Sequence, residues 1–524
     1  MKIVLVRVPT IIDASASTAP ICPPVGLAYL KAICSRFSKQ ITVIDSVGNK
    51  PEVTRMQLGN TSFRILGESA ETIAAYVPAD SEIILFSIMF SQDWPYAREV
   101  LREIRKRATN AVIIAGGEHI SAVPEFSMNS APEIDVCVLG EGENTLHALL
   151  THYQNSSALP TEIPGTCVRH PTKGFHSNVK QARITVLKEI PDPDWDGFPL
   201  DNYLDNGHGF GVNHGRSMPI VATRGCPYQC TFCSNPQMWT TAWKSREPED
   251  VLREIKIYIA KYRATNFDFY DLTAIVKKDW IVRFCKMLIE ENLNITWQLP
   301  SGTRSEAIDR EVAALLYASG CRNLSYAPES GSPEILTLIK KKISVPKMLE
   351  SMRGCVRERL SVKANIICGF PDETWAHLRQ TLWFIVKVAA TGIDDLSINQ
   401  FSPYPGSELF DRLVKEGKVQ LNDEYFESLS YYSSMTNARS YGNHLSNRDI
   451  LIYKTLGTSL FYLTAFGLHP IRVFTTIRNA IRGVETNRLD KTLNAYLLRF
   501  RATPNASRKS IKPREDSENR PDVA

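Results

Sequence analysis

The sequence has no run of apolar residues long enough to cross a membrane. The stretch from Thr455 to Leu468 is uncharged for fourteen residues, whereas a membrane-spanning helix needs about 20. At the N-terminus, Arg7 and Pro9 interrupt the apolar run that a signal peptide would require. We therefore expect a cytoplasmic protein.

A strong charge imbalance is also missing. The net charge of +5 is small for 524 residues, and no block of Lys and Arg of the kind that grips phosphates is present, so no nucleic-acid partner is expected. Eleven cysteines are dispersed along the chain, and outside one cluster of three they stand in apolar runs, where a small thiol packs well. This usage is typical of reduced, intracellular proteins. The length accommodates about three domains.

The three clustered cysteines follow the apolar run from Pro219 to Ala222. They are Cys226, Cys230 and Cys233, a C-x3-C-x2-C pattern on a loop that leaves the end of a predicted strand. Three thiolates close together indicate a metal site. A structural zinc site needs a fourth Cys or His, and the nearest histidines precede the strand, so zinc is the less favoured alternative. A cubane iron–sulfur cluster held by three thiolates leaves one iron open to a ligand.

With Phe232 before the last cysteine, this loop resembles the signature of the radical S-adenosylmethionine (SAM) superfamily. The resemblance implies that the open iron of a [4Fe-4S] cluster binds the amino and carboxylate groups of SAM. One electron from the cluster then cleaves SAM to a 5′-deoxyadenosyl radical. An electron donor such as a flavodoxin or a ferredoxin is an implied partner.

Residues 1–155 alternate short apolar runs with helical segments, which is the pattern of a parallel sheet wound with helices. The predicted strands cover residues 2–8, 40–45, 82–90, 111–116 and 134–140, and the predicted helices cover 24–37, 68–77, 94–108 and 143–153. Five strands that alternate with helices in this way predict a flavodoxin-like (Rossmann-type) α/β domain. Such sheets bind ligands at the carboxyl ends of their strands.

Glycines gather at those predicted strand ends. Glycine lets the backbone approach a bulky ligand, but a turn from strand to helix needs glycine in any case, so the residues alone leave both explanations open. Beside the cysteine loop, residues 23–30, 116–119 and 140–143 resemble the cobalamin-binding domain that precedes the radical SAM core in one large branch of these enzymes. The resemblance implies cobalamin contacts from Pro24, Gly26, Ser87, Gly116, Gly117, His119, Gly140, Glu141 and Gly142.

The Asp-x-His-x-x-Gly motif that supplies a lower histidine ligand in other cobalamin proteins is absent. We therefore expect cobalt to be bound without a protein histidine. His119 is the one histidine near the right loop, and a place in the pocket wall is favoured for it over a role as ligand.

After a Pro- and Gly-rich linker at residues 156–216, strand and helix alternate again over residues 217–410. The predicted strands lie near 218–224, 266–271, 295–301, 322–328, 362–369 and 394–401. Six such units predict a partial (β/α)6 barrel, in which the chemistry gathers on loops at the carboxyl ends of the strands.

Polar residues and glycines follow these strand ends, in segments that resemble the SAM-binding loops of the superfamily. The implied SAM contacts are Phe232, Asp271, Arg304, Glu329, Ser330, Ile367 and Gly369. Glu329 would accept hydrogen bonds from the ribose hydroxyls, and Arg304 would face the carboxylate. Structural alternatives stay open, because Asp271 could cap the following helix and Arg304 could form an ion pair with Glu329. The Gly-Gly-Glu run common after the second strand is missing, and Asn365 stands where a glycine is common.

Residues 411–500 have a helical pattern, and residues 501–524 have no apolar face and should be disordered. Within the helical region, residues 455–482 join the uncharged stretch to a basic amphipathic segment. A helix covering the open side of the barrel is the favoured explanation. Peripheral contact with a membrane surface, or a lipophilic substrate, is the alternative.

Cobalamin and a SAM-derived radical in one chain suggest methylation of an unactivated carbon or phosphorus centre in a small-molecule or lipid-like intermediate. The alternative is a cyclisation or rearrangement without methyl transfer, as in the anaerobic Mg-protoporphyrin cyclase, which together with the class B radical SAM methyltransferases forms the group that this chain resembles. A non-catalytic cobalamin sensor would leave the three cysteines without a role. A tRNA-modifying methylthiotransferase would need three further cluster cysteines in its N-terminal domain, and Cys22, Cys34 and Cys137 are scattered.

Overall fold

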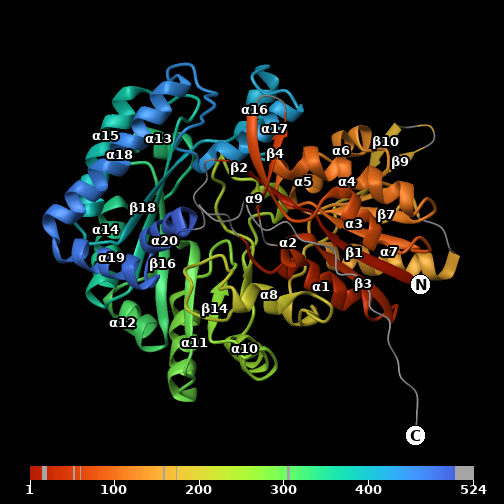
Figure 1. The fold of residues 1–524 in the computed structure, drawn as a ribbon, viewed down its shortest axis with the longest axis horizontal. Helices are drawn as coiled ribbons and strands as arrows, with labels where there is room; N and C mark the ends of the chain where they lie inside the picture. The colour runs from red at the N-terminus through yellow and green to blue at the C-terminus, as the bar shows by residue number, and fades with distance from the viewer. Residues whose placement is uncertain are drawn as a thin grey trace, which may run out of the picture.

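The computed structural model describes residues 1–14, 21–50, 53–58, 61–156, 160–170, 172, 174–303 and 307–501. Figure 1 shows two α/β units beside each other. The N-terminal sheet and its helices lie on the right and the six-stranded parallel sheet lies on the left. The helices Asn447–Leu468 and Ile471–Arg482 follow the outer side of that sheet, and the last helix, Arg488–Arg501, lies nearer the centre of the view.

Five parallel strands form the centre of the N-terminal sheet. They are β1 (Lys2–Arg7), β3 (Gln40–Asp45), β6 (Ile83–Ser87), β7 (Val112–Gly116) and β8 (Val136–Val138). Their spatial order, β8-β7-β6-β1-β3, is the 2-1-3-4-5 order of a flavodoxin-like sheet. This confirms the predicted fold class.

Helices cover both faces of this sheet. The helices are α1 (Val25–Cys34), α2 (Ser46–Asn49), α3 (Ala70–Tyr76), η1 (Ser91–Asp93), α4 (Trp94–Arg107), α5 (Glu118–Ala122), α6 (Pro124–Ser130) and α7 (Gly142–Ser156). Alternate side chains of a strand point to opposite faces, and β1 shows the result. Ile3 and Leu5 join one buried cluster with residues of α1 and α7, whereas Val4 and Val6 join another with residues of α3 and α4.

Two parts of the N-terminal unit differ from the sequence-based prediction. Strands β9 (Thr166–His170) and β10 (Gly174–Ser177) extend the sheet in antiparallel fashion next to β8, so the sheet continues into residues predicted to be linker. Strands β2 (Thr10–Asp13), β4 (Val53–Leu58) and β5 (Thr61–Leu66) form a separate antiparallel sheet. Polar residues interrupt these strands, which therefore lack the continuous apolar runs of the central ones.

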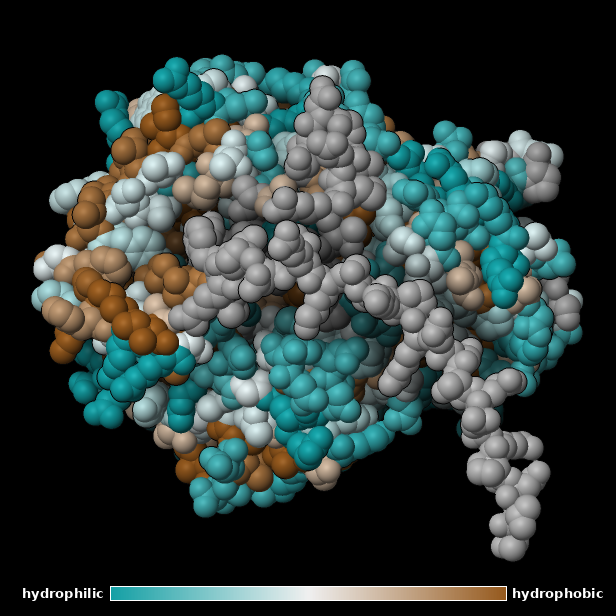
Figure 2. All heavy atoms as spheres, viewed as in Figure 1, coloured by the Kyte–Doolittle hydropathy of each residue, from teal (hydrophilic) through white to brown (hydrophobic). Residues whose placement is uncertain are grey.

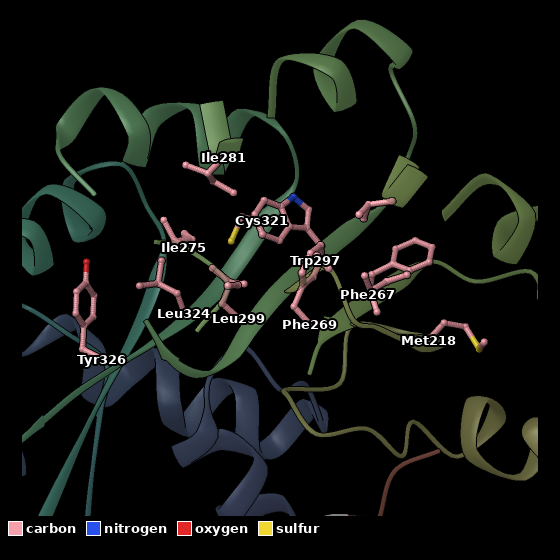
Figure 3. Packing of buried hydrophobic residues seen from close by; sticks show 14 of the residues in the cluster. Met218, Phe267, Phe269, Ile275, Ile281, Trp297, Leu299, Cys321, Leu324 and Tyr326 are labelled. Atoms are coloured by element: carbon pink, nitrogen blue, oxygen red, sulfur yellow. The ribbon is translucent and has the colours of Figure 1, made fainter. Parts of the chain in front are cut away.

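The second unit has six parallel strands in sequence order. They are β11 (Ser217–Ile220), β14 (Asn266–Phe269), β15 (Thr296–Thr303), β16 (Cys321–Glu329), β17 (Ser361–Cys368) and β18 (Asp395–Gln400). Within the described residues β11 and β18 form the two edges of this sheet, which agrees with the predicted partial barrel. Outward side chains pack against the surrounding helices, and the rings of Phe269 and Trp297, labelled in Figure 3, have centroids 5.2 Å apart.

The remaining elements connect and cover these sheets. They are η2 (Leu187–Glu189), α8 (Leu200–Asp205), β12 (Thr223–Arg224), α9 (Asn235–Met238), β13 (Lys244–Ser245), α10 (Pro248–Tyr262), α11 (Lys278–Glu291), α12 (Arg310–Ala318), α13 (Pro333–Leu338), α14 (Val345–Arg357), α15 (Trp375–Ala389), α16 (Glu408–Lys415), α17 (Asp423–Ser428), η4 (Leu429–Ser433), α18 (Asn447–Leu468), α19 (Ile471–Arg482) and α20 (Arg488–Arg501). Helix α18 packs on α15 and β18, while α17 and η4 contact η1 of the N-terminal unit.

The helical pattern predicted for residues 411–500 is present. Residues 502–524, predicted to be disordered, lie outside the described part of the chain. Among the described helices, none alone is long and apolar enough to span a membrane. Helices α18 and α19 meet that criterion only as a pair, and the pair is bent by 110°.

Candidate active site

The three cysteines of the loop between β12 and α9 lie close together. None of the three thiols forms a disulfide and all three are partly exposed, and the amide of Cys233 donates to the carbonyl of Cys230 at 3.1 Å. The hydroxyl of Thr273 lies 3.4 Å from the sulfur of Cys226. Burial raises the pKa of Cys233 to about 12, and the neighbouring Cys230 and Cys226 thiols act in the same direction.

The spacing of these thiols bears on the choice of metal. Within the described residues, no three ligating side chains converge as closely as a single metal ion requires. Zinc would draw its thiolates to one point at about 2.3 Å, whereas a cubane cluster distributes them over separate irons. A loop that offers three thiols matches the donor set of a [4Fe-4S] cluster in which one iron stays open to a further ligand.

The cysteine loop is fixed by backbone hydrogen bonds on both sides. The amide of Thr231 donates to the carbonyl of Ile339, just after α13, at 3.1 Å, and its carbonyl accepts from the amide of Leu409 in α16 at 2.9 Å. Before the loop, the buried carboxylate of Asp271 accepts from the amides of Ala222, at 3.2 Å, and Thr223.

Asp271 therefore braces the chain that leads to the cysteines. Helix α11 begins at Lys278, so Asp271 is not its cap. Burial raises the pKa of Asp271 to about 6, although the hydrogen bonds that it accepts act against this rise.

Other predicted SAM contacts meet at the ends of β16 and β17. The ring of Phe232 lies 5.8 Å from that of Phe370, and Ile367 packs against the same buried cluster. Gly369 has a φ of +86°, which favours glycine, and its amide donates to buried Glu373 at 2.6 Å. The structure thus brings an aromatic and an aliphatic side chain next to a glycine turn.

Glu329 stands at the end of β16 in a strained conformation. Its φ is +64°, and such left-handed geometry costs a non-glycine residue about 1–3 kcal/mol and concentrates at functional sites. Its carboxylate pairs with Lys341 at 2.9 Å. Arg304 lies outside the described residues. The side chain of Ser330 is fully buried and its hydroxyl lies 3.1 Å from that of Thr381 in α15, so it is directed away from the strand end.

A cavity of about 160 Å³ lies at the carboxyl ends of β6, β7 and β8. Seven residues of the predicted cobalamin set line it: Gly26, Ser87, Gly116, Gly117, Gly140, Glu141 and Gly142. A Cβ added at Gly26 would meet no atom within 4 Å, whereas one at Gly117 would lie 2.2 Å from the carbonyl oxygen of Ile88. Gly26 therefore leaves space for a ligand, and Gly117 is required by the turn itself. This cradle fits part of a large planar cofactor.

The other two predicted cobalamin residues lie beside the cavity. Pro24 immediately precedes α1. His119 is 1% exposed, stacks on Trp94 with ring centroids 4.6 Å apart, and hydrogen-bonds the hydroxyl of Ser91 at 2.9 Å. Burial lowers its pKa to about 3, so it is a neutral core histidine whose ring nitrogens are engaged. His119 is not among the residues that line the cavity, so the place in the pocket wall expected for it is not observed, and cobalt bound without a protein histidine stays a prediction.

One wall of the cobalamin cavity comes from residues of the second unit, which were not predicted from the sequence. Arg224 and Trp239 line the same cavity, and the guanidinium of Arg224 bonds Glu141 at 3.1 Å and Glu143 at 2.6 Å. Arg183 also bonds Glu141, at 2.6 Å. Arg224 stands two residues before Cys226, so the cysteine loop and the cavity share one segment. Its partners are about 80 residues away in the chain, and no local pattern identifies them.

A second cavity, of about 330 Å³, lies inside the partial barrel. Polar residues of three neighbouring strands line it. Ser325 of β16, Lys363 of β17 and Asp395 of β18 lie side by side in the sheet, as do Asn365 of β17 and Ser397 of β18, and Asn399 follows further along β18. The connector closes one end, because the amide of Val212 donates to Gln298 at 3.0 Å and that of Gly211 to Asp268 at 3.0 Å. The lining suits a molecule with several hydrogen-bonding groups.

Comparison with known proteins agrees with this geometry. The chain matches the Radical SAM superfamily over residues 220–385 and the B12 binding domain over residues 12–150. An uncharacterized methyltransferase of Pyrococcus horikoshii, PH0819, is 28% identical over 79% of this chain and 83% of its own length. The anaerobic magnesium-protoporphyrin IX monomethyl ester cyclase of Cereibacter sphaeroides is 25% identical over 62% of this chain, which spans 52% of the cyclase.

The fold is that of a solved methyltransferase. The radical SAM methyltransferase TsrM from Kitasatospora setae, determined with cobalamin and a [4Fe-4S] cluster bound, superposes with a TM-score of 0.64 at 15% identity, over 87% of this chain and 91% of TsrM. The barrel and its cysteine loop define a radical SAM protein. With the B12-binding domain in the same chain, this protein is a cobalamin-dependent radical SAM enzyme.

The open space at Gly26 generates a test of the cobalamin cavity. Gly26→Leu should weaken cobalamin binding by about tenfold or more, because the new side chain occupies space that the ligand needs. Leucine favours a helix over glycine, so α1 should not be destabilised. Titration of the apoprotein with hydroxocobalamin, followed by absorbance, measures the effect. Gly467→Leu, at a helical glycine that also has open space around it, is the matched control. If Gly26→Leu binds cobalamin as tightly as the unchanged protein does, cobalamin does not bind in this cavity.

The cysteine loop generates a second test. Cys230→Ala should lose the brown absorbance of the iron–sulfur cluster and retain cobalamin, because Cys230 does not line the cobalamin cavity. Iron analysis and absorbance spectra of the anaerobically reconstituted protein check both parts. Cys285→Ala, at a buried thiol in α11, should keep both cofactors. Loss of cobalamin together with the cluster in Cys230→Ala would contradict the separation of the two sites.

Proposed function

We propose that this enzyme transfers a methyl group, by a radical route, to an unactivated carbon or phosphorus centre of a small-molecule or lipid-like substrate. The observation that carries the proposal is Arg224, which joins the cysteine loop to the cobalamin cavity through buried ion pairs. When bound, the cluster supplies the electron that cleaves SAM to a 5′-deoxyadenosyl radical, and cobalamin supplies the methyl group. The name of the P. horikoshii relative, an uncharacterized methyltransferase, supports this choice.

The residues at the strand ends take complementary roles in this proposal. Cys226, Cys230 and Cys233 would hold the cluster and leave its fourth iron for SAM. The strained carboxylate of Glu329 would accept from the ribose hydroxyls, and Phe232 with Ile367 would flank the adenine. Residues 217–410 would form the radical SAM core, and the sheet that extends to Ser177 would belong to the cobalamin-binding unit.

The barrel cavity is the proposed place for the reacting part of the substrate. Its amide, hydroxyl and lysine side chains would orient a molecule that offers several hydrogen-bond acceptors, and the barrel wall would exclude water from a carbon radical. A flavodoxin or a ferredoxin is the proposed electron donor. None of the eleven cysteines forms a disulfide, which supports operation in a reducing compartment.

A cyclisation or rearrangement without methyl transfer is the second candidate. The C. sphaeroides cyclase supports it, since its similarity covers 62% of this chain. The same cofactor sites would serve both reactions, so the difference lies in whether a methyl group leaves SAM.

The products of SAM distinguish these functions. Reconstituted enzyme with cobalamin, reductant and a metabolite extract should form S-adenosylhomocysteine in step with 5′-deoxyadenosine, measured by liquid chromatography and mass spectrometry. Cys230→Ala should form no deoxyadenosine, because the cluster is lost. Deoxyadenosine without S-adenosylhomocysteine would contradict methyl transfer and favour cyclisation. Neither product, from protein that holds both cofactors, would favour a cobalamin sensor.

A further inference from the structure

Helix α19 turns its apolar side chains outward. Ile471, Phe474 and Ile481 are 74%, 74% and 72% exposed, whereas Asn479 is 4% exposed. A surface helix of a globular protein normally does the reverse, with its apolar stripe toward the core and its polar residues toward water. The exposed stripe of α19 therefore has no explanation in the packing of the described chain.

The apolar surface continues onto the neighbouring helices. Leu463 and Leu468 of α18 are 73% and 56% exposed, and Trp383 of α15 is 62% exposed. We call the exposed apolar residues of α18 and α19 the α18–α19 face, and Figure 2 shows hydrophobic surface where Figure 1 places these helices. Large exposed apolar side chains gathered on packed helices in this way mark a site of interaction with another protein or a membrane.

Polar contacts hold α19 in this orientation. The guanidinium of Arg472 donates to the carbonyls of Ile393, at 2.6 Å, and Gly392, and lies 3.3 Å from the carboxylate of Asp394. On the same buried side, the amide nitrogen of Asn479 donates to Asp490 at 2.8 Å. Rotating α19 to bury its apolar stripe would break these bonds and expose groups that they satisfy. The outward stripe is therefore part of the folded arrangement.

The segment from Ile450 to Val484 itself carries charge of one sign, and the carboxylate of Asp394 beside it is paired with Arg472. No Asp or Glu occurs between Ile450 and Val484, while Arg478 and Arg482 are exposed and flank the apolar stripe. On α15, the ammonium of Lys387 lies 5.8 Å from the centre of the Trp383 ring. Apolar and aromatic residues with flanking cations, and no acidic residue among them, complement an anionic lipid surface.

We propose that the α18–α19 face docks this enzyme on the surface of an anionic bilayer. Helix α19 lies along the interface with its apolar side chains below the headgroups, and Arg478 and Arg482 meet lipid phosphates. The contact is peripheral, because the other side of α18 is packed on α15 and β18. Docking goes beyond the proposed function and does not depend on it.

The alternative is that a second copy of the chain, rather than a bilayer, covers the α18–α19 face. A two-fold interface places each patch against itself, so the arginines of one copy would approach those of the other without acidic residues on the face to offset them. Like charges across an interface disfavour association. This charge pattern favours the bilayer.

Vesicle flotation tests the docking. Full-length protein should float with vesicles of phosphatidylcholine that contain about a third phosphatidylglycerol, less so without the anionic lipid, and less so as salt rises. Phe474→Ser combined with Ile481→Ser should reduce the bound fraction by about tenfold, because the apolar anchor is removed. Arg478→Gln combined with Arg482→Gln should remove the preference for phosphatidylglycerol. Val179→Ser, at a residue that is 81% exposed in the N-terminal unit, is the matched control and should bind as the unchanged protein does.

Retained cobalamin absorbance shows that the variants are folded. Equal binding by the unchanged protein and the Phe474→Ser, Ile481→Ser variant would overturn the proposal, as would an absence of binding to any vesicle. A dimer in solution that dissociates on Phe474→Ser would also overturn it, in favour of a second copy. None of these outcomes requires SAM or a substrate, so failure here is distinguishable from failure of the proposed methyl transfer.

Discussion

The buried guanidinium of Arg224 is the contact on which the arrangement of the two units depends. Burying a charge is costly unless it is paired, and here two arginines, Arg183 and Arg224, meet two glutamates, Glu141 and Glu143. Glu141 lies in the loop after β8, Glu143 lies in the first turn of α7, and Arg224 comes from the strand that leads to the cysteines. Removing one partner would leave an unpaired buried charge, so the network fixes the cysteine loop against the N-terminal sheet.

This constraint explains why both sites lie where the two sheets meet. Parallel sheets bind ligands at the carboxyl ends of their strands, and the ends of β6, β7 and β8 are covered by Arg224 and Trp239 of the second unit. Ser234, directly after the last cysteine, donates to Glu118 of α5. In the proposed methyl transfer, a methyl donor and a radical source would both have to reach the same substrate atom, and the shared segment would supply that proximity.

Much of this fold could be predicted because its central strands are buried on both faces and read as apolar runs. Residues 111–116 are predicted as a strand, and Val112–Gly116 form β7, whose middle three residues are buried. The edge strand β3 also has the limits predicted for it, residues 40–45. The β9–β10 hairpin escaped prediction because it is short and lies among prolines and glycines. The sequence places His119 directly after the glycines at the end of a predicted strand. Its contacts with Ser91 and Trp94 come from a different segment of the chain, and no pattern in a single sequence shows contacts of that kind. The Arg224 network was missed for the same reason.

The proposed reaction depends most on a cluster that binds SAM through a vacant iron next to cobalamin. Electron paramagnetic resonance of the anaerobically reconstituted, dithionite-reduced protein, recorded with and without SAM, tests this most directly. We predict a [4Fe-4S] signal whose spectrum changes when SAM is added. A preparation that holds zinc at the three cysteines, or a cluster whose spectrum is unchanged by SAM, would contradict the account.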